Sequence, residues 1–346
     1  MLSFRGSVIL AAATFAVPAH AAPNVLPIGP CINIGNTFEV GKSVQLDRQS
    51  TVGPADFARI KAAGFDTIRM PVRWDQRSQD KPPYTVDPAW MRTVQTAVDQ
   101  ALAAGLNVIL NSHHFEPIHT DPIGTQPWHT GVWSQIAPRF SAYPVDRLWF
   151  ELENEPHGKF DDSNLRAVLD PALAVVRKTN PDRPVIYGGQ NWSGVDSLAT
   201  LTLPDDPAVY PTFHYYEPFR FTHQGASWVT PDMPPPGRVY GGANDAVQLQ
   251  RDVAKVKAYT LRTGKIPFVG ETGAYEKHIP LAQRATYAKA VNDAFAGSGV
   301  GVCQWAYKNT FPLYDKAKGI WLPGMRAALG LRETPPVKGR RARRAQ

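Results

Sequence analysis

The stretch LWFELENEP, residues 148–156, alternates apolar side chains with glutamates and ends at Pro156. Glu151, Glu153 and Glu155 occupy every second position, so in a β-strand their side chains share one face. Each residue adds about 3.3 Å along a strand, so Glu155 lies nearest the strand end and Glu151 about 13 Å deeper. We therefore expect Glu155 to carry chemistry at the rim, and the two deeper glutamates to be hydrogen-bonded or paired inside the fold.

Similar segments, rich in apolar or β-branched residues, recur along the rest of the chain. With LWFELENEP they number eight, and the others are CINIGNTF (31–38), FDTIRMPV (65–72), NVILNSHH (107–114), PVIYGGQNW (184–192), VYPTFHYY (209–216), IPFVGETG (266–273) and GVCQWAY (301–307). Helical patterns separate several of them, most clearly at 53–64 and 87–105, where proline opens the pattern and glycine ends it. Weaker helical patterns cover about 163–178, 245–263 and 281–296.

This alternation of strands and helices predicts a single-domain α/β fold, the (β/α)₈ TIM barrel. An open, doubly wound sheet is the alternative, but no glycine-rich phosphate-binding turn follows the first strand. The proline-rich stretch 228–238 falls after the sixth predicted strand, where we expect a long loop that forms a wall of the substrate cleft.

Both ends of the chain differ in composition from its body. Residues 1–21 resemble a secretory signal peptide: Arg5, an apolar run over 8–17, then Ala19-His20-Ala21 as a cleavage site. A buried first helix is the alternative. We expect a catalytic domain over 22–334, followed by a basic, disordered tail over 335–346. The protein is then secreted or periplasmic, and no other stretch has the ~20 apolar residues of a membrane span.

The net charge of +7 comes mainly from the two ends of the chain. Five positive charges lie in the tail and one in the signal segment, so the body is nearly neutral. We therefore expect no nucleic-acid partner. We also expect no membrane partner after signal cleavage, and a monomer. Cys31 and Cys303 are the two cysteines, and in an exported protein either a disulfide or two free thiols is compatible with the sequence.

Glu271 is a second glutamate at a strand end, in the segment FVGETG. In barrel enzymes the C-terminal strand ends form the active site, so Glu155 and Glu271 are expected to face each other there. Glycoside hydrolysis needs such a pair, one carboxyl group to protonate the leaving oxygen and one to attack or stabilise the anomeric centre. Two unrelated salt bridges at the rim are the alternative.

Other strand ends carry further polar and aromatic residues: Arg69, His113, Asn154, His214, Tyr216 and Trp305. With these motifs in order, INIGNTFE, R-x-P-V, a His pair, N-E-P, H-x-Y, GE and the final Trp, the sequence resembles glycoside hydrolase family 5. That family consists of retaining (β/α)₈ enzymes and includes many cellulases. The matching motifs run from Ile32 to about Tyr307, which is nearly the whole body of the chain.

The resemblance implies a role for each matching residue. Glu155 corresponds to the acid/base and Glu271 to the nucleophile, with Arg69 keeping Glu271 ionised. Asn154 is expected to donate a hydrogen bond to the sugar 2-hydroxyl. His113, His214 and Tyr216 would position the sugar and the carboxyl groups. Trp305 would form a platform under the cleaved ring.

Some positions leave the subfamily and substrate open. Family members often have an aromatic residue after the nucleophile, where this chain has Thr272. Asn36 and Glu39, after the first strand, are further candidates for sugar contact. Four tryptophans in or near rim loops could either stack on sugars or pack in the core: Trp74, Trp133, Trp192 and Trp228.

A metal-dependent hydrolase is another reading, suggested by His113, His114, Glu116 and His119. Adjacent residues of a strand point to opposite faces, so we do not expect His113 and His114 to share a metal, and we expect no metal and no cofactor.

The sequence thus predicts an exported endo-β-1,4-glucanase, a cellulase acting on a β-linked polysaccharide or oligosaccharide with retention. A β-mannanase or another β-glucanase is the alternative within the same chemistry. A non-catalytic carbohydrate-binding protein on the same scaffold is the alternative from a different class.

Overall fold

The computed structural model describes residues 24–45 and 51–332, and the predicted signal peptide and basic tail lie outside them. Eight parallel strands form one closed barrel in the order β10-β2-β3-β4-β5-β6-β7-β9. Each of the eight predicted segments contains one barrel strand, so the predicted fold is confirmed. The strands are β2 (Cys31–Asn33), β3 (Thr67–Val72), β4 (Asn107–Ser112), β5 (Leu148–Glu151), β6 (Val185–Tyr187), β7 (Val209–His214), β9 (Phe268–Thr272) and β10 (Val302–Gln304).

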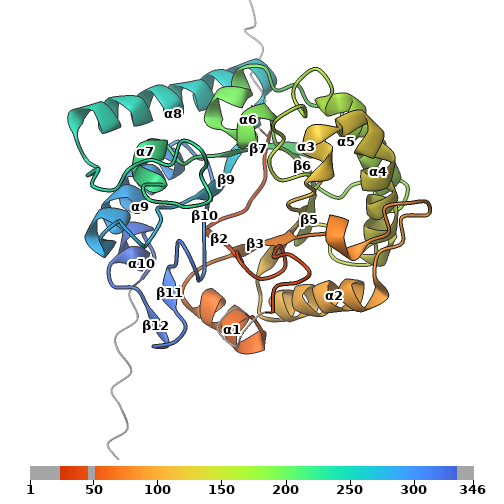
Figure 1. The fold of residues 1–346 in the computed structure, drawn as a ribbon, viewed down its shortest axis with the longest axis horizontal. Helices are drawn as coiled ribbons and strands as arrows, with labels where there is room; N and C mark the ends of the chain where they lie inside the picture. The colour runs from red at the N-terminus through yellow and green to blue at the C-terminus, as the bar shows by residue number, and fades with distance from the viewer. Residues whose placement is uncertain (1–23, 46–50, 333–346) are drawn as a thin grey trace, which may run out of the picture.

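Helices form a ring around the barrel (Figure 1). The long ones are α1 (Pro54–Ala62), α2 (Pro88–Ala103), α4 (Pro122–Arg139), α5 (Leu165–Arg177), α8 (Ala243–Thr263) and α9 (Leu281–Ala296). Shorter elements are α3 (Pro117–Thr120), α6 (Gln190–Ser193), α7 (Phe219–Thr222), α10 (Met325–Ala328), and the 3₁₀ turns η1 (Asp75–Arg77) and η2 (Val195–Ala199). Across the described part of the chain, no helix combines the length and the apolar character that a bilayer crossing requires.

Helix α4 has no counterpart among the predicted helices. Its 18 residues include Pro127 and Pro138 inside the helix, together with two glycines, and these residues normally interrupt helical patterns. Packing explains why the helix nevertheless forms. His129 and Trp133 are buried, and the side chains of both contact the carbonyl oxygen of Leu152 on the outside of the barrel.

Strand β5 shows how the sequence divides between the two sides of the barrel wall. Leu148, Phe150 and Leu152 belong to the core between the strands and the helices, as predicted. Trp149 belongs to a second, smaller core inside the lower barrel, and Glu151 lies above it. That inner core also contains Leu26, Ile28, Ile109, Ile186 and Phe268.

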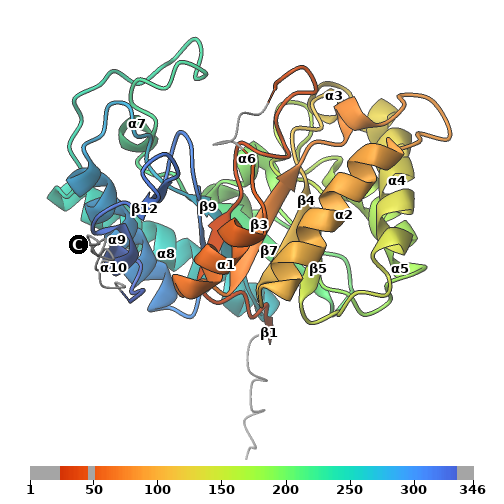
Figure 2. The same ribbon diagram turned by 90° about the horizontal axis from the view of Figure 1, so that it is seen from below.

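The segment that leads into the first barrel strand closes the lower end of the barrel. β1 (Asn24–Val25) pairs with β8 (Lys265–Ile266), and Figure 2 shows β1 at the end opposite to the loops that carry α3 and α7. The remaining strands, β11 (Tyr314–Asp315) and β12 (Ile320–Trp321), form a hairpin-like pair after the barrel. The C-terminal strand ends are therefore the open end at which a site can form.

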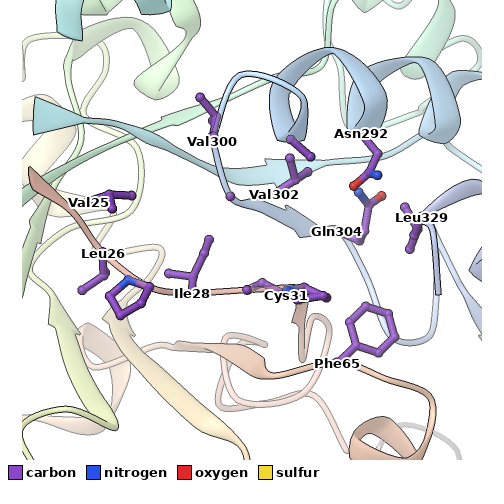
Figure 3. Close-up of a pocket in the computed structure, with 16 residues that line it drawn as sticks. Val25, Leu26, Ile28, Cys31, Phe65, Asn292, Val300, Val302, Gln304 and Leu329 are labelled. Atoms are coloured by element: carbon purple, nitrogen blue, oxygen red, sulfur yellow. The ribbon is translucent and has the colours of Figure 1, made fainter. Parts of the chain in front are cut away.

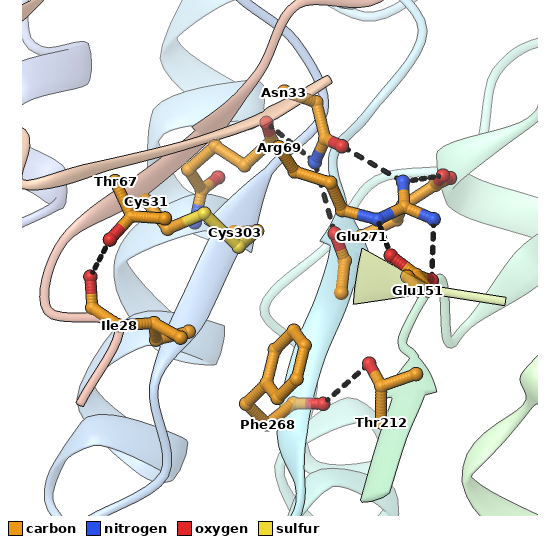
Figure 4. The surroundings of a disulfide bond; sticks show 12 residues. Ile28, Cys31, Asn33, Thr67, Arg69, Glu151, Thr212, Phe268, Glu271 and Cys303 are labelled. Carbon is orange, nitrogen blue, oxygen red and sulfur yellow. Dashed lines mark hydrogen bonds and ion pairs between the residues drawn. A yellow bond between two sulfur atoms is a disulfide. The ribbon is translucent and has the colours of Figure 1, made fainter. Parts of the chain in front are cut away.

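Cys31 and Cys303 form a disulfide bond, which resolves the choice that the sequence left open (Figure 4). The two residues are direct register partners on β2 and β10, the first and last strands of the barrel. Their separation of 272 residues in sequence means that the bond links nearly the whole barrel into one covalent ring. It lies inside the lower barrel, among the residues of the smaller core.

Candidate active site

The structure brings Glu155 and Glu271 together at the C-terminal end of the barrel. One oxygen of each carboxyl group and one ring nitrogen of His214 all lie within 4.8 Å of one another. Glu271 lies on β9, whereas Glu155 follows the end of β5 in a loop. The Glu155 side chain is 23% exposed and that of Glu271 6%, so Glu155 is the more accessible of the two carboxyl groups.

Arg69, on β3, is fully buried beneath this pair and binds the nucleophile candidate directly. Its Nη1 donates to Oε1 of Glu271 at 2.6 Å (Figure 4). Its Nε and Nη2 donate to the two oxygens of Glu151 at 2.7 and 2.9 Å. Arg69 thus places a fixed positive charge beside Glu271, and Glu151 is paired inside the barrel, as the alternation predicted.

The other oxygen of Glu271 also has a donor. The hydroxyl group of Tyr216 donates to Oε2 of Glu271 at 2.9 Å. Burial raises the pKa of Tyr216 well above its ordinary value, so the phenol remains a donor at neutral pH. With Arg69 on one oxygen and Tyr216 on the other, the Glu271 carboxylate is held in one orientation by two donors.

Asn154 lies directly before Glu155 and is anchored from below. Its side-chain oxygen accepts a 2.5 Å hydrogen bond from Nη2 of Arg69. Its backbone carbonyl accepts a hydrogen bond from the hydroxyl group of Ser193, which is buried after β6. Because the amide oxygen is bound to Arg69, the amide nitrogen is the end suited to donate to a substrate hydroxyl.

Two rings lie side by side near the carboxyl groups. His113, after β4, is buried, and its ring stacks on the half-buried Trp305 with ring centres 5.6 Å apart and planes 6° apart. Burial lowers the pKa of His113 well below its ordinary value, so the ring is neutral. Trp305 extends from the loop after β10, where a flat apolar face can pack against a sugar ring.

The loop after β2 contains Asn36 and Glu39. The backbone N–H groups of Asn36 and Thr37 both donate to the Glu39 carboxylate, and the Asn36 side chain donates to Thr310 at 3.2 Å. Glu39 is 4% exposed, and burial raises its pKa to about 7. Glu39 therefore binds its own loop, whereas Asn36 is half-buried at its edge.

The four rim tryptophans fall into two groups. Trp74 and Trp133 are fully buried and pack in the core, whereas Trp192 and Trp228 are 56% and 50% exposed. Trp192 stacks on His157 with ring centres 4.8 Å apart, and His157 stacks in turn on His119 at 3.7 Å.

Trp228, in the proline-rich loop, lies on another part of the rim against Tyr275 and Phe311.

Burial is the main cause of the pKa shifts of Glu155 and Glu271. Burial raises the pKa of Glu155 to about 7, although the charge of Arg69 and the nearby His157 lower it in part. Burial also raises the pKa of Glu271, while His214 and Arg69 lower it. Burial lowers the pKa of His214 to about 4, so its ring is neutral near pH 7. A carboxyl group with a pKa near 7 can donate a proton at neutral pH, as an acid catalyst must.

The predicted shared face of the three glutamates is wrong for Glu153. Its carboxylate accepts a hydrogen bond from Ser112 at 3.0 Å and lies 3.5 Å from His129 of α4, outside the barrel. The reason is that β5 ends at Glu151, so strand alternation does not apply to the residues that follow.

Strand alternation likewise does not apply to His113 and His114, which follow the end of a strand. β4 ends at Ser112, and His114 has a φ of +53°, which turns the chain. The rings of His113 and His114 consequently lie 4.4 Å apart rather than on opposite faces.

Thr272, where family members often have an aromatic residue, lies on the helix-facing side of the barrel wall. Its side chain is buried and lies 3.3 Å from the hydroxyl group of Tyr287 on α9. It therefore packs between barrel and helix.

Two residues of the site were missed in the sequence. Asn33 accepts a hydrogen bond from Nη1 of Arg69 at 2.9 Å and donates to backbone carbonyls of β9 and β10. Its place in INIGN, on the inner face of β2 at the level of Arg69, was the available signal. His157 has its Nδ1 2.6 Å from the carbonyl oxygen of Glu155 and so fixes the loop that carries Glu155.

The described residues that could share a cation are Glu155, His214 and Glu271. Both oxygens of Glu271 already accept hydrogen bonds, and Arg69 lies 2.6 Å from one of them. A fixed positive charge at that distance opposes a second cation, so the arrangement suits proton transfer and nucleophilic attack.

A separate pocket of about 360 Å³ lies at the other end of the molecule (Figure 3). It is lined by the segment 25–31 before and into β2, by residues of α9 and β10, and by Phe65 and Leu329. Leu26 and Cys31 belong both to its lining and to the core of the lower barrel. The pocket is therefore distinct from the carboxyl pair.

Comparisons with known proteins agree with the geometry. The model of the family Cellulase (glycosyl hydrolase family 5) matches residues 38–310. Endoglucanase H of Acetivibrio thermocellus is 38% identical over 281 residues, which cover 81% of this chain and 30% of that protein. The chain thus spans less than a third of the length of that relative.

Solved structures of endoglucanases superpose over most of the chain. A hyperthermophilic endo-β-1,4-glucanase in complex with substrate has a TM-score of 0.82 and 35% identity, covering 88% of this chain and 97% of that one. Cel5A of Thermotoga maritima, solved with cellobiose and with mannotriose, has a TM-score of 0.83 and 31% identity, covering 87% and 97%. The carboxyl pair, the barrel and these matches agree, and the chain belongs to glycosyl hydrolase family 5, the cellulase family.

Proposed function

We propose that the chain is an endo-β-1,4-glucanase that hydrolyses internal β-glucosidic bonds with retention of configuration. The observation that carries this proposal is the approach of Glu155 and Glu271, whose carboxyl oxygens come within 4.8 Å of each other. Retaining glycosidases hold their two carboxyl groups about 5–5.5 Å apart, whereas inverting enzymes leave about 6.5–9.5 Å for a water molecule. The endoglucanase relatives support β-1,4-glucan as the substrate.

In the first step, the Glu271 carboxylate attacks the anomeric carbon while the Glu155 carboxyl group gives its proton to the glycosidic oxygen. The bond between the anomeric carbon and that oxygen breaks, and the sugar becomes an ester of Glu271. Arg69 and Tyr216 fix the attacking carboxylate through the hydrogen bonds described above.

In the second step, Glu155 is a carboxylate and removes a proton from water. The water oxygen attacks the same anomeric carbon, and Glu271 leaves as a carboxylate. Each step inverts the anomeric carbon, so the product retains the β configuration. Loss of the negative charge of Glu271 in the ester lowers the pKa of Glu155 and favours its role as a base.

The experiment is an assay of sugar release from carboxymethyl cellulose, mixed-linkage glucan and mannan. We expect activity on the first two, and we expect Glu155→Gln and Glu271→Gln each to lower kcat at least 1,000-fold on natural substrates. Glu276→Gln is the matched control, because Glu276 is exposed and lies five residues beyond Glu271. Parental activity in either active-site variant would contradict the assigned roles.

A β-mannanase is the second candidate, because the similar Cel5A of Thermotoga maritima was solved with mannotriose. Strong activity on mannan alone would favour it over the glucanase. We also propose that the protein is exported, because residues 1–21 resemble a secretory signal peptide. Binding of glucan without turnover by the parental protein would instead favour a non-catalytic carbohydrate-binding protein.

A further inference from the structure

Glu151 is a buried carboxylate that the proposed reaction does not use. It is the last residue of β5, and its side chain is 0% exposed. Both of its oxygens accept hydrogen bonds from Arg69, at 2.7 and 2.9 Å (Figure 4). A buried carboxylate is costly to desolvate, and this one is matched by a paired cation rather than left alone.

The contact with Glu151 fixes the plane of the Arg69 guanidinium group. Two parallel hydrogen bonds donated to one carboxylate leave the planar guanidinium group little freedom to rotate. The remaining donors then point to Glu271, Asn33 and Asn154, at 2.6, 2.9 and 2.5 Å. Glu151 thus determines, through Arg69, where the nucleophile and Asn154 are held.

The charges around Glu151 can be identified strand by strand. Its register partners on the flanking strands are Asn111 of β4 and Ile186 of β6, and neither has an ionisable side chain. The ionisable groups of the site that face it are Arg69 from β3, His214 from β7, Glu271 from β9 and Glu155 above it.

His113, after β4, and Tyr216, after β7, are further ionisable groups of the site, and Glu39 and His157 interact with Glu271 and Glu155 from the surrounding loops. Burial lowers the pKa of both His113 and His214 and raises that of Tyr216, so all three are neutral near pH 7. When Glu271 is ionised, the charges joined by hydrogen bonds to Arg69 are those of Arg69, Glu151 and Glu271, and this group is net negative because Glu151 is present.

We propose that Glu151 is a positioning residue whose buried negative charge offsets Arg69 and thereby sets the pH range in which Glu155 and Glu271 are active. This inference rests on the proposed hydrolytic function. Without that charge, the positive charge of Arg69 would be balanced by Glu271 alone. It would then favour the ionised forms of Glu155 and Glu271. The site would also lose negative charge that stabilises the oxocarbenium-like transition state.

The experiment compares the pH dependence of kcat/KM for the parental protein, Glu151→Gln and Glu151→Asp on a cello-oligosaccharide. In Glu151→Gln, both limbs of the profile should move to lower pH by about one unit, the size expected for removing one buried charge. In Glu151→Asp the charge is kept, so the limbs should stay within about 0.3 units of the parental profile even if kcat falls.

Glu153→Gln is the matched control. It removes another fully buried glutamate of the same stretch, but one that faces Ser112 and His129 outside the barrel. It should change thermal stability without moving either limb. Limbs that stay in place in a folded Glu151→Gln variant would overturn the proposal, because a merely structural role changes the rate and not the profile.

A variant that adds a negative charge tests the proposal even if Glu151→Gln does not fold. Asn33→Asp places an added negative charge at Nη1 of Arg69, so both limbs should move to higher pH. Failure of both variants to fold would assign Glu151 to stability alone and overturn the proposal. A parental protein without hydrolytic activity would instead refute the proposed function, so the two failures are distinguishable.

Discussion

The Nδ1 atom of His214 lies 2.6 Å from Oε1 of Glu155. Burial lowers the pKa of His214 to about 4, so the ring is neutral near pH 7. The contact with His214 uses one oxygen of Glu155, so the other oxygen is the one that can carry the proton to the glycosidic oxygen. A neutral ring favours the carboxylate form of Glu155 less than a histidine cation at this place would.

The pH profile of hydrolysis follows from this arrangement. Glu155 must be protonated to act as an acid, and burial raises its pKa to about 7. We therefore expect kcat/KM to fall as pH rises through about 7, and to fall at low pH as Glu271 becomes protonated. Initial rates on a cello-oligosaccharide between pH 4 and 9 measure this. A rate that stays constant from pH 6 to 9 would contradict the role of Glu155.

Stability should depend on pH through the same group. The pKa of Glu155 is raised from 4.5 to about 7 on folding, so its contribution to stability is present below pH 4.5 and is lost as pH rises through 7. Glu155→Gln should therefore match the parental free energy of unfolding near pH 4 and exceed it at pH 8, by at most ~3 kcal/mol.

Denaturant unfolding at the two pH values measures this difference. An equal effect of Glu155→Gln at pH 4 and at pH 8 would show that the carboxyl group is not perturbed in the folded protein. Glu276→Gln is again the control, since Glu276 is exposed and should have no such pH dependence.

The disulfide should contribute to stability and little to the chemistry. It links residues 272 apart in sequence, and chain-entropy models give about 6 kcal/mol for such a loop. It lies in the lower barrel, away from the carboxyl pair. The variant Cys31→Ser/Cys303→Ser should unfold at markedly lower denaturant concentration yet keep most of its activity at 25 °C. Equal midpoints for the two proteins would refute this expectation.

Trp192 is expected to serve binding rather than folding. Its side chain is 56% exposed and is supported from one side by the ring of His157. Trp192→Ala should lower kcat/KM on long cello-oligosaccharides about 10-fold, because a sugar–aromatic contact is lost, and should change Tm by less than about 2 °C.

Trp321→Ala is the matched control for Trp192→Ala. Trp321 stacks on Phe65, so its loss should lower Tm and leave kcat/KM unchanged. Steady-state kinetics and thermal unfolding of both variants separate the two roles. Equal kinetics of Trp192→Ala and the parental protein would exclude a binding role for this side chain.

The positions of the barrel strands were predicted best, because they follow from the periodicity of apolar residues. All eight barrel strands lie within the predicted segments, and the alternation in LWFELENEP correctly placed Phe150 outside and Glu151 inside the barrel. Periodicity fails where the strand ends. Glu153 and His114 lie beyond β5 and β4, and local backbone turns, which leave no periodic signal, determine where their side chains lie.

Other features depend on contacts between distant parts of the chain. The disulfide needs β2 and β10 to be neighbours, which only closure of the barrel brings about. Helix α4 forms against the barrel despite Pro127 and Pro138, because tertiary packing outweighs local propensity. The role of Asn33 likewise becomes apparent only once Arg69 is placed beside it.

We propose that Glu155 and Glu271 act together as acid/base and nucleophile of a retaining hydrolase. The most direct test is the anomeric form of the first product, measured by NMR during cleavage of a defined β-1,4-linked glucan oligosaccharide. We expect the β-anomer to appear first and the α-anomer to follow only by mutarotation. Initial release of the α-anomer would contradict this proposal.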